Sequence, residues 1–263
     1  MKKIIAMLLL AAMCLTLFAG CAKSGTQETE PQKLILATSA DYPPFEFHIV
    51  DADGKDAIVG IDVSVAKKIA QDMGLELEIL DLSFDNLVTA MEKGQADIVI
   101  SAMESDEKRE ASVDFSDAYY TDYPPLILVK KENLDSYKSL SDFDGKTVGA
   151  QTATTKETAV KDLMPGASLL SLASVNDLVN NLVYDKCDAI VLDYAVAKQY
   201  AESNDQLAVA GVELGQAAAY KVAVQEGDPK GLLPEINKII AQILSDGTME
   251  QYIADAEAQY AEG

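Results

Sequence analysis

The chain has 263 residues, a formal net charge of −22 and a single histidine, His48. A surface this acidic repels nucleic acid and anionic lipid, so the composition excludes both as binding partners. One histidine excludes a histidine-based metal site, and no close group of His and Cys residues replaces it. We therefore expect neither a metal nor a cofactor.

The N-terminal residues are typical of a secretory signal. Two lysines precede an apolar stretch that runs to Ala19, and a glycine and Cys21 follow. This ending resembles a bacterial lipobox, which implies a signal peptide over 1–20 and an acylated Cys21. The alternative is an ordinary signal peptide that ends near a cysteine by chance. Residues 21–32 are polar and predict a flexible tether, so we expect an extracytoplasmic protein anchored by lipid to the cell membrane.

Apolar periodicity predicts two α/β units in series, followed by a strand and two helices. In the segment GIDVSVAKKIAQDMG, apolar residues recur every four positions from Ile61 to Met73, which predicts a helix that ends at Gly74. The first unit has strands expected over 33–38, 75–80 and 96–101 and helices over 60–74 and 84–94. The second has strands expected over 124–131, 146–151 and 188–193 and helices over 155–164, 174–186 and 194–203. The third region has a strand expected over 220–225 and two helices over 231–259.

Strands that alternate with helices predict parallel pairing, because a crossover helix returns the chain to the same end of the sheet. Two such sheets suggest two lobes with a cleft between them. Ligands bind beyond the carboxyl ends of strands in open α/β sheets, so functional residues should follow strands. The segment ATSADYPPFEF follows the first strand, and we expect it to be a loop stiffened by Pro43 and Pro44. We expect 51–54 to form a hairpin turn.

Arg109 is the only arginine, against 20 lysines, and it follows the apolar strand ADIVI. Its guanidinium offers a rigid fork of donors that grips a carboxylate, which a lysine does not. Asp193 is an isolated acid at the end of the strand DAIVL, in the other unit. One cation and one anion that face a shared cleft would bind a free α-amino acid. The alternative for Arg109 is a chance surface charge.

The mature chain resembles the amino-acid-binding extracellular solute-binding proteins that serve ABC importers. The matching runs, in order, are ATSADYPPFEF, VGIDVSVAKKIA, FDNLVTAM, ADIVISAM, VDFSDAYY, LSDFDGKTVGAQTATT and DAIVLD. The resemblance implies a two-lobed, Venus-flytrap fold with two hinge crossings, each lobe a mostly parallel sheet flanked by helices. It places lobe 1 at 33–121 plus 221–263 and lobe 2 at 122–220.

The resemblance also implies a role for individual residues. Arg109 would hold the ligand carboxylate, Asp193 the ligand ammonium, and Thr155 would hold the ligand from the second lobe. Two aromatic rings, Tyr42 and Phe84, would sandwich the ligand side chain. The backbone at Ser101 and Ala102 would lie beside the ligand carboxylate, and Gln151 would read the ligand side chain. Glu104 is the last predicted site residue.

Three residues depart from the family pattern. Glu104 stands where Ser or Thr is usual and would repel a ligand carboxylate unless it swings away or pairs with Lys108 or a cationic ligand. Ala153 replaces a customary glycine. Ser39 stands where members that bind basic amino acids often carry an acid, which weighs against arginine or lysine, whereas Glu104 weighs for them. The ligand class stays open between basic and neutral polar amino acids.

The resemblance implies a monomeric, non-catalytic receptor that delivers a polar amino acid to a membrane permease of an ABC transporter. Two alternatives remain. The same fold serves ligand sensors, and nearby permease and ATPase genes would separate transport from sensing. It also serves dehydratases that act on cyclic carboxylic acids, in which Glu104 would be a general acid.

Overall fold

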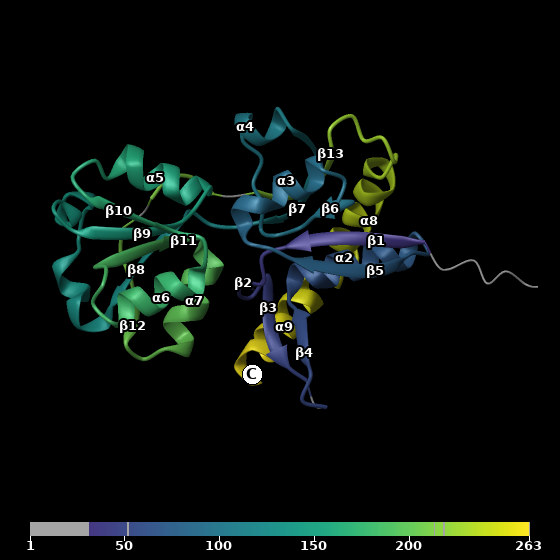
Figure 1. Ribbon diagram of the computed structural model, residues 1–263. Helices are drawn as coiled ribbons and strands as arrows, with labels where there is room; N and C mark the ends of the chain where they lie inside the picture. Colours follow the sequence, from purple (N-terminus) through teal and green to yellow (C-terminus); the bar gives the residue numbers. More distant parts are fainter. Residues whose placement is uncertain (1–31, 52, 213, 218, 263) are drawn as a thin grey trace, which may run out of the picture. The chain divides into compact units, whose positions relative to one another are not determined.

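A computed structural model describes residues 32–51, 53–212, 214–217 and 219–262 (Figure 1). The predicted signal peptide and Cys21 lie outside the described residues, as does the predicted tether except for its last residue. Within the described ranges, no helix combines the length and the apolar character needed to cross a membrane.

Five strands form the first sheet in the order β5-β1-β6-β13-β7. They are β1 (Lys33–Thr38), β5 (Glu76–Asp81), β6 (Ile98–Val99), β7 (Val113–Thr121) and β13 (Ala219–Gln225). β1 pairs in parallel with β5 and β6, as the strand–helix–strand order predicts. β13 runs antiparallel to β6 and β7, because it returns from the second sheet and not through a crossover helix. The sheet is therefore mixed.

The second sheet repeats this arrangement in the order β10-β9-β11-β8-β12. Its strands are β8 (Leu126–Lys130), β9 (Thr147–Gln151), β10 (Ser168–Leu172), β11 (Ala189–Leu192) and β12 (Leu207–Ala210). β9 pairs in parallel with β10 and β11, and β8 pairs antiparallel with β11 and β12. The periodicity did not predict β10 and β12. Both are edge strands that are partly exposed, so each lacks the continuous apolar run of a central strand.

Helices cover both faces of each sheet, and strand alternation sorts the core residues between those faces. Leu36 and Ile98 belong to the same core cluster as α2 (Ile61–Asp72) and α8 (Leu233–Ser245). Their chain neighbours Ala37 and Val99 belong to the cluster of α3 (Leu87–Glu92) on the other face. In Figure 1, α5 (Thr155–Leu163) lies on one face of the second sheet, and α6 (Val175–Val183) and α7 (Tyr194–Ser203) lie on the other.

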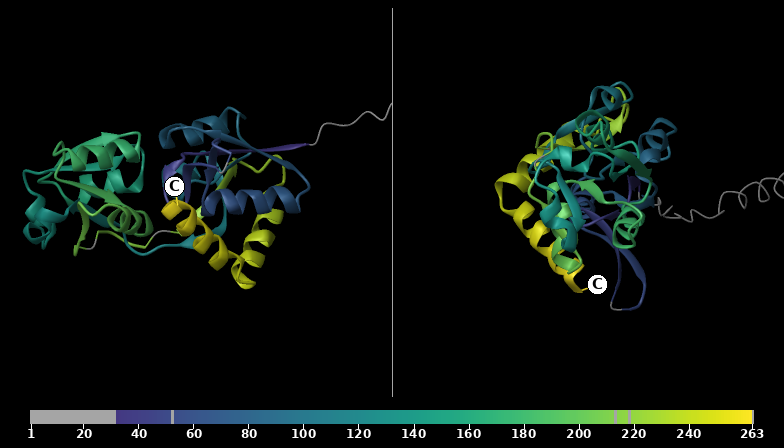
Figure 2. Two further views of the ribbon diagram at one scale, coloured as in Figure 1. Left: turned by 90° about the horizontal axis from the view of Figure 1, so that it is seen from below. Right: turned by 90° about the vertical axis from the view of Figure 1, so that its left-hand side faces the viewer.

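The C-terminal helix α9 (Thr248–Glu262) packs beside α2 and α8, and its end lies next to β3 (Glu46–Val50), where the Tyr260 and Phe47 ring centroids are 5.3 Å apart (Figures 1 and 2). The expected helix over 60–74 is confirmed. It begins at Ile61, and Gly74 follows it with a φ of 68°. The C-terminal helices α8 and α9 thus form one layer with α2. The strand β13 joins strands from the N-terminal part of the chain in the first sheet.

The segment after β1 is not simply a loop, which corrects the expectation for ATSADYPPFEF. β2 (Asp41–Tyr42), β3 (Glu46–Val50) and β4 (Asp56–Val59) form a small antiparallel sheet. The chain turns between β3 and β4 at Asp53 and Gly54, within the expected hairpin turn over 51–54, of which Ala52 lies outside the described residues. The short strands escaped prediction because Pro43 and Pro44 interrupt them, and proline cannot donate to a sheet ladder.

The chain crosses between the two five-stranded sheets twice. The first crossing joins the end of β7 at Thr121 to the start of β8 at Leu126, and the second joins β12 to β13. Asp122 lies in the first crossing and accepts hydrogen bonds from the Ala195 amide, in the second-sheet unit, and the Tyr220 hydroxyl, in β13, each at 3.1 Å. This carboxylate therefore ties the first crossing to both units.

Candidate functional site

A cavity lies where the carboxyl ends of parallel strands from both sheets meet. Ser39 follows β1, Ser101 follows β6, Gln151 ends β9 and Asp193 follows β11. This is the place where α/β sheets bind ligands. All nine predicted ligand-binding residues line the cavity: Tyr42, Phe84, Ser101, Ala102, Glu104, Arg109, Gln151, Thr155 and Asp193. The sequence analysis did not predict four further lining residues: Ser39, Glu46, Thr154 and Lys156.

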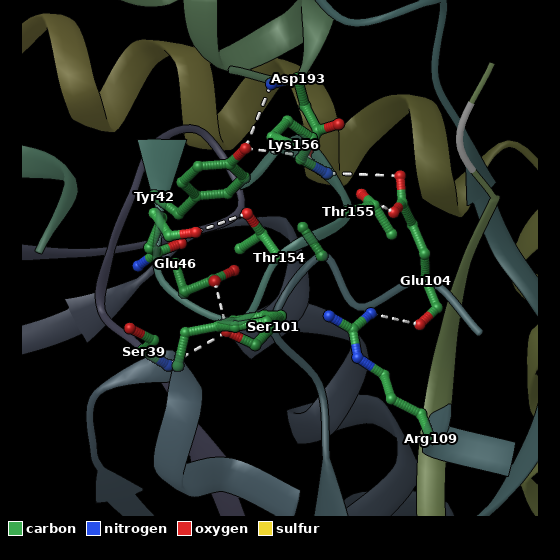
Figure 3. A pocket seen from close by; sticks show the side chains of 13 residues that line it. Ser39, Tyr42, Glu46, Ser101, Glu104, Arg109, Thr154, Thr155, Lys156 and Asp193 are labelled. Carbon is green, nitrogen blue, oxygen red and sulfur yellow. Dashed lines mark hydrogen bonds and ion pairs between the residues drawn. The ribbon is translucent and has the colours of Figure 1, made fainter. Parts of the chain in front are cut away.

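The space between these residues is small. The lining side chains approach one another closely and leave little room between them. Such a space holds about one water molecule. Figure 3 shows Tyr42, Lys156 and Asp193 gathered on one side of the cavity and Arg109 on another.

Arg109 lies in α4 (Glu107–Glu110), a short helix that Asp106 caps by accepting from the Arg109 backbone amide at 2.8 Å. The guanidinium donates to the Glu104 carbonyl at 2.6 Å and to the Ala153 carbonyl, in the other lobe, at 2.9 Å. It also lies 5.2 Å from the centroid of the Phe84 ring. Burial lowers the pKa of Arg109 from its usual value. The side chain is thus fixed in the cavity wall, and the chance-surface alternative is wrong because only 7% of the residue is exposed.

Asp193 lies directly before α7 and is 1% exposed. Its Oδ2 accepts from the Tyr42 hydroxyl at 2.7 Å and pairs with Lys156 Nζ at 2.6 Å. Its Oδ1 is buried and has no hydrogen-bond partner among the described residues. Burial raises the pKa of Asp193, and the charge of Lys156 opposes that rise. A buried carboxylate oxygen without a donor suits a ligand that brings its own N–H groups.

Lys156 is the charged residue that sequence reasoning missed. It is in the first turn of α5, next to Thr155, and is 5% exposed. Its Nζ contacts Asp193 at 2.6 Å and Glu104 Oε1 at 3.3 Å. Burial would lower the pKa of Lys156, but the charges of Asp193 and Glu104 outweigh burial and raise it. Its position directly after a predicted site residue at a helix start was the available signal.

Glu104 bonds across the cleft to two residues of α5. Its carboxylate accepts from the Thr155 hydroxyl and pairs with Lys156. The expected partners were Lys108 or a cationic ligand, so the structure supplies a different cation. The repulsion that Glu104 would exert on a ligand carboxylate is reduced by Lys156, which carries the opposite charge.

A buried carboxyl pair supports the backbone beside Arg109. Asp62 accepts from the Ala102 amide at 2.6 Å and the Tyr119 hydroxyl at 2.8 Å, and Glu46 accepts from the Ser101 hydroxyl at 2.7 Å. The two carboxyls are neighbours, and Glu46 Oε2 is buried without a donor among the described residues, so a proton on one carboxyl would give the other a partner. Burial, followed by the charge of Asp62, raises the pKa of Glu46 well above its usual value, and burial raises the pKa of Asp62 to about 6. One proton shared by the pair removes their mutual repulsion.

The turn after β9 shapes the opposite wall. Ala153, where the family has glycine, adopts a positive φ of 64°, so the backbone takes the left-handed conformation even without glycine. Thr154 caps α5 by accepting from the Glu157 amide at 3.2 Å. The side-chain amide of Gln151 donates a hydrogen bond to the Ala173 carbonyl at 3.0 Å, so the nitrogen of that amide is directed at the backbone of Ala173.

Several contacts join residues of the two lobes around the cavity. They are Tyr42 to Asp193, Arg109 to Ala153, Glu104 to Lys156, and the Val175 amide to Asp41 at 2.7 Å. All but the last involve groups that line the cavity or the turn beside it. A ligand that entered would replace some of them, so binding and lobe contact are coupled through the same side chains.

The described part of the chain contains no group of three or more His, Cys, Asp or Glu side chains placed to hold a metal ion. Cys187 is buried, and burial raises the pKa of its thiol to about 12.

The sequence pattern of the bacterial extracellular solute-binding proteins, family 3, matches residues 34–255. The arginine-binding extracellular protein ArtP of Bacillus subtilis is 36% identical over 249 residues, which cover 93% of this chain and 94% of ArtP. A substrate-binding protein of an amino acid ABC transporter from Streptococcus pneumoniae, solved with L-arginine, has a TM-score of 0.82 and 37% identity, covering 86% of this chain and 94% of its own. AncCDT-1, an ancestral amino acid-binding protein described as a precursor of cyclohexadienyl dehydratase, has a TM-score of 0.76 and 32% identity, covering 85% of this chain and 94% of its own.

Proposed function

Because the chain belongs to the bacterial extracellular solute-binding proteins, family 3, we propose that its cavity binds a free basic amino acid, arginine foremost, for delivery to an ABC permease. One observation carries the proposal: the Arg109 guanidinium and the Asp193 carboxylate line the same buried cavity from different lobes. In this assignment the guanidinium grips the ligand carboxylate, and Asp193 Oδ1 accepts from the ligand ammonium.

A basic side chain is favoured by the charges that line the cavity and by the relatives. Glu46, Glu104 and Asp193 contribute three carboxyl groups. ArtP carries arginine in its name, and the S. pneumoniae protein was solved with arginine bound. Ser39 argued against a basic ligand, but Glu46 lies in the same cavity and supplies a carboxyl group from a different position. We therefore resolve the open ligand class in favour of basic amino acids.

We further propose that the protein is a receptor and not an enzyme. Glu104 was the candidate general acid, but its carboxylate already bonds Thr155 and Lys156. A general acid must be within hydrogen-bond reach of its substrate and hold a proton to give. The AncCDT-1 relative keeps the dehydratase alternative open to test, and loss of water from a cyclic carboxylic acid is the reaction to assay.

The remaining organisation follows from the same proposal. Lobe 1 comprises 33–121 plus 221–263 and lobe 2 comprises 122–220. The protein acts outside the cytoplasm, which its extracellular family supports, and we propose that it acts as a monomer. Acylation of Cys21 after removal of 1–20 would anchor it to the membrane by a flexible tether. Mass spectrometry of the detergent-extracted protein would show a diacylglyceryl adduct on Cys21.

Thermal unfolding of the purified protein with each of the twenty amino acids tests the binding proposal. A ligand that binds the folded state raises the unfolding midpoint by mass action. We expect the largest rise with arginine and none with arginine in Arg109→Ala, because that change leaves Asp193 to bind alone and costs about 2–5 kcal/mol of affinity. Lys108→Ala, one residue away and exposed, is the matched control and should keep the rise. No rise with any amino acid would refute the proposal.

A further inference from the structure

The ammonium of Lys156 lies where a bound amino acid would place a positive group. Its Nζ pairs at 2.6 Å with Asp193, the carboxylate assigned to the ligand ammonium. It also contacts Glu104, so a single lysine joins both lobes through two carboxylates. A ligand ammonium at Asp193 Oδ1 would come close to this lysine, and two like charges at that distance repel.

The small volume of the cavity supports this reading. The space left between the lining residues holds about one water molecule, so a ligand must displace groups that now fill the site, and the Lys156 ammonium is the group at Asp193. Lys156 is placed to leave, because it also lines a second, larger groove, which Glu104 and Thr155 line as well. Ser105, Thr158 and Asp162 contribute polar groups to that groove. A lysine on a flexible stem can turn its ammonium from the cavity to the groove.

The charges of the site change with the position of that lysine. With Lys156 inside, the carboxylates of Glu104 and Asp193 are balanced by Lys156 and Arg109, and the site is neutral because Glu46, whose pKa burial raises well above its usual value, holds the proton that it shares with Asp62. With Lys156 outside, the site carries one net negative charge. A neutral site fits a zwitterion, whereas a site with one negative charge fits an amino acid whose side chain adds a positive charge.

We propose that Lys156 is a tethered occupant of the binding site, which the cationic groups of the ligand displace, and that its displacement sets the preference for basic amino acids. The inference rests on the proposed function and goes beyond it. Lys156 holds the lobes together through Glu104 and neutralises Asp193 within its own lobe until a ligand takes over those contacts. It therefore lowers ligand affinity and protects two buried carboxylates from being left without a counter-charge.

Replacement of Lys156 by methionine tests this role, because methionine keeps an unbranched apolar stem and removes the charge. In calorimetric titrations, Lys156→Met should bind arginine about tenfold or more tightly than the wild type, since no internal cation competes. The affinity for citrulline, the neutral isostere of arginine, should increase less in Lys156→Met than the affinity for arginine does. Without ligand, Lys156→Met should unfold at a lower temperature, because Asp193 and Glu104 lose their partner. Lys161→Met, on the same helix but exposed, is the control and should bind as the wild type does.

The outcomes separate the two proposals. If the wild type binds no amino acid, the proposed function fails. If the wild type binds arginine but Lys156→Met binds it more weakly or equally, Lys156 is a ligand contact or a bystander, and the inference alone is overturned. If Lys156→Met does not fold, Lys156→Gln keeps a polar group at the position and answers the same question.

Discussion

The buried pair of Glu46 and Asp62 makes folding stability depend on pH in a direction that can be predicted. The folded pKa of Asp62 is raised to about 6, and that of Glu46 lies well above its usual value, with burial as the first cause for both. Between about pH 5 and pH 7, the folded protein therefore holds a proton that the unfolded chain releases. Each such proton lowers the free energy of unfolding by about 1.4 kcal/mol per pH unit as the pH rises.

The substitution Glu46→Gln removes that proton but keeps the size of the side chain. The new amide can donate to Asp62 and accept from Ser101, which preserves the contacts under Ala102. Over about two pH units the wild type should lose up to about 3 kcal/mol of stability that the variant keeps. Several other acids in the chain are also buried, and they contribute equally to the pH dependence of both proteins. The difference in the free energy of unfolding between the wild type and Glu46→Gln therefore reports on the Glu46–Asp62 pair.

Urea unfolding across this pH range, without ligand, measures the effect. The wild type should become less stable with rising pH more steeply than Glu46→Gln does. Glu76→Gln, an exposed carboxyl in β5, is the control and should follow the wild type. Equal slopes for the wild type and Glu46→Gln would refute the shared proton.

Two further predictions concern residues around the same site. Tyr42→Phe removes the hydroxyl that bonds Asp193 across the lobes, so arginine affinity measured by calorimetry should fall by about 1–3 kcal/mol. The control Tyr184→Phe, at a residue that is 71% exposed, should have no effect on binding. Unchanged binding in Tyr42→Phe would contradict the assigned contact. Gly60→Ala should lower the free energy of unfolding by more than about 3 kcal/mol, because φ is 123° and the added Cβ would lie 2.1 Å from the Phe45 carbonyl oxygen. Gly74→Ala, with a φ of 68° and open space around it, should cost about 1–2 kcal/mol, and an equal loss for both variants in urea unfolding would show that the clash at Gly60 is not decisive.

The fold was largely predictable because its central elements carry strong apolar signals. β1, β9 and β11 are buried runs, and α2 has a regular apolar stripe, so periodicity finds them. Periodicity does not reveal the antiparallel strand β13 as a partner of β7, since their pairing joins residues about a hundred positions apart. The short strands β2 and β3 escaped for a local reason, namely the two prolines between them.

The candidate site was predictable where a residue type is unusual in this chain. Arg109 is the only arginine, and Asp193 is an isolated acid at the end of an apolar strand. Lys156 is one of 20 lysines and lies in a polar segment. Its place directly after Thr155 at a helix start is a weak signal, which does not distinguish a buried lysine from an exposed one. Its burial between Asp193 and Glu104 depends on how the two lobes meet, which is a property of the folded structure.

The central claim is that Arg109 and Asp193 together hold a free amino acid, and a crystal structure of the protein with arginine tests it most directly. The account predicts the arginine carboxylate on the Arg109 guanidinium, the α-ammonium at Asp193, and the Lys156 ammonium away from Asp193. Arginine bound outside this cavity, or bound in it with its carboxylate far from Arg109, would contradict the account.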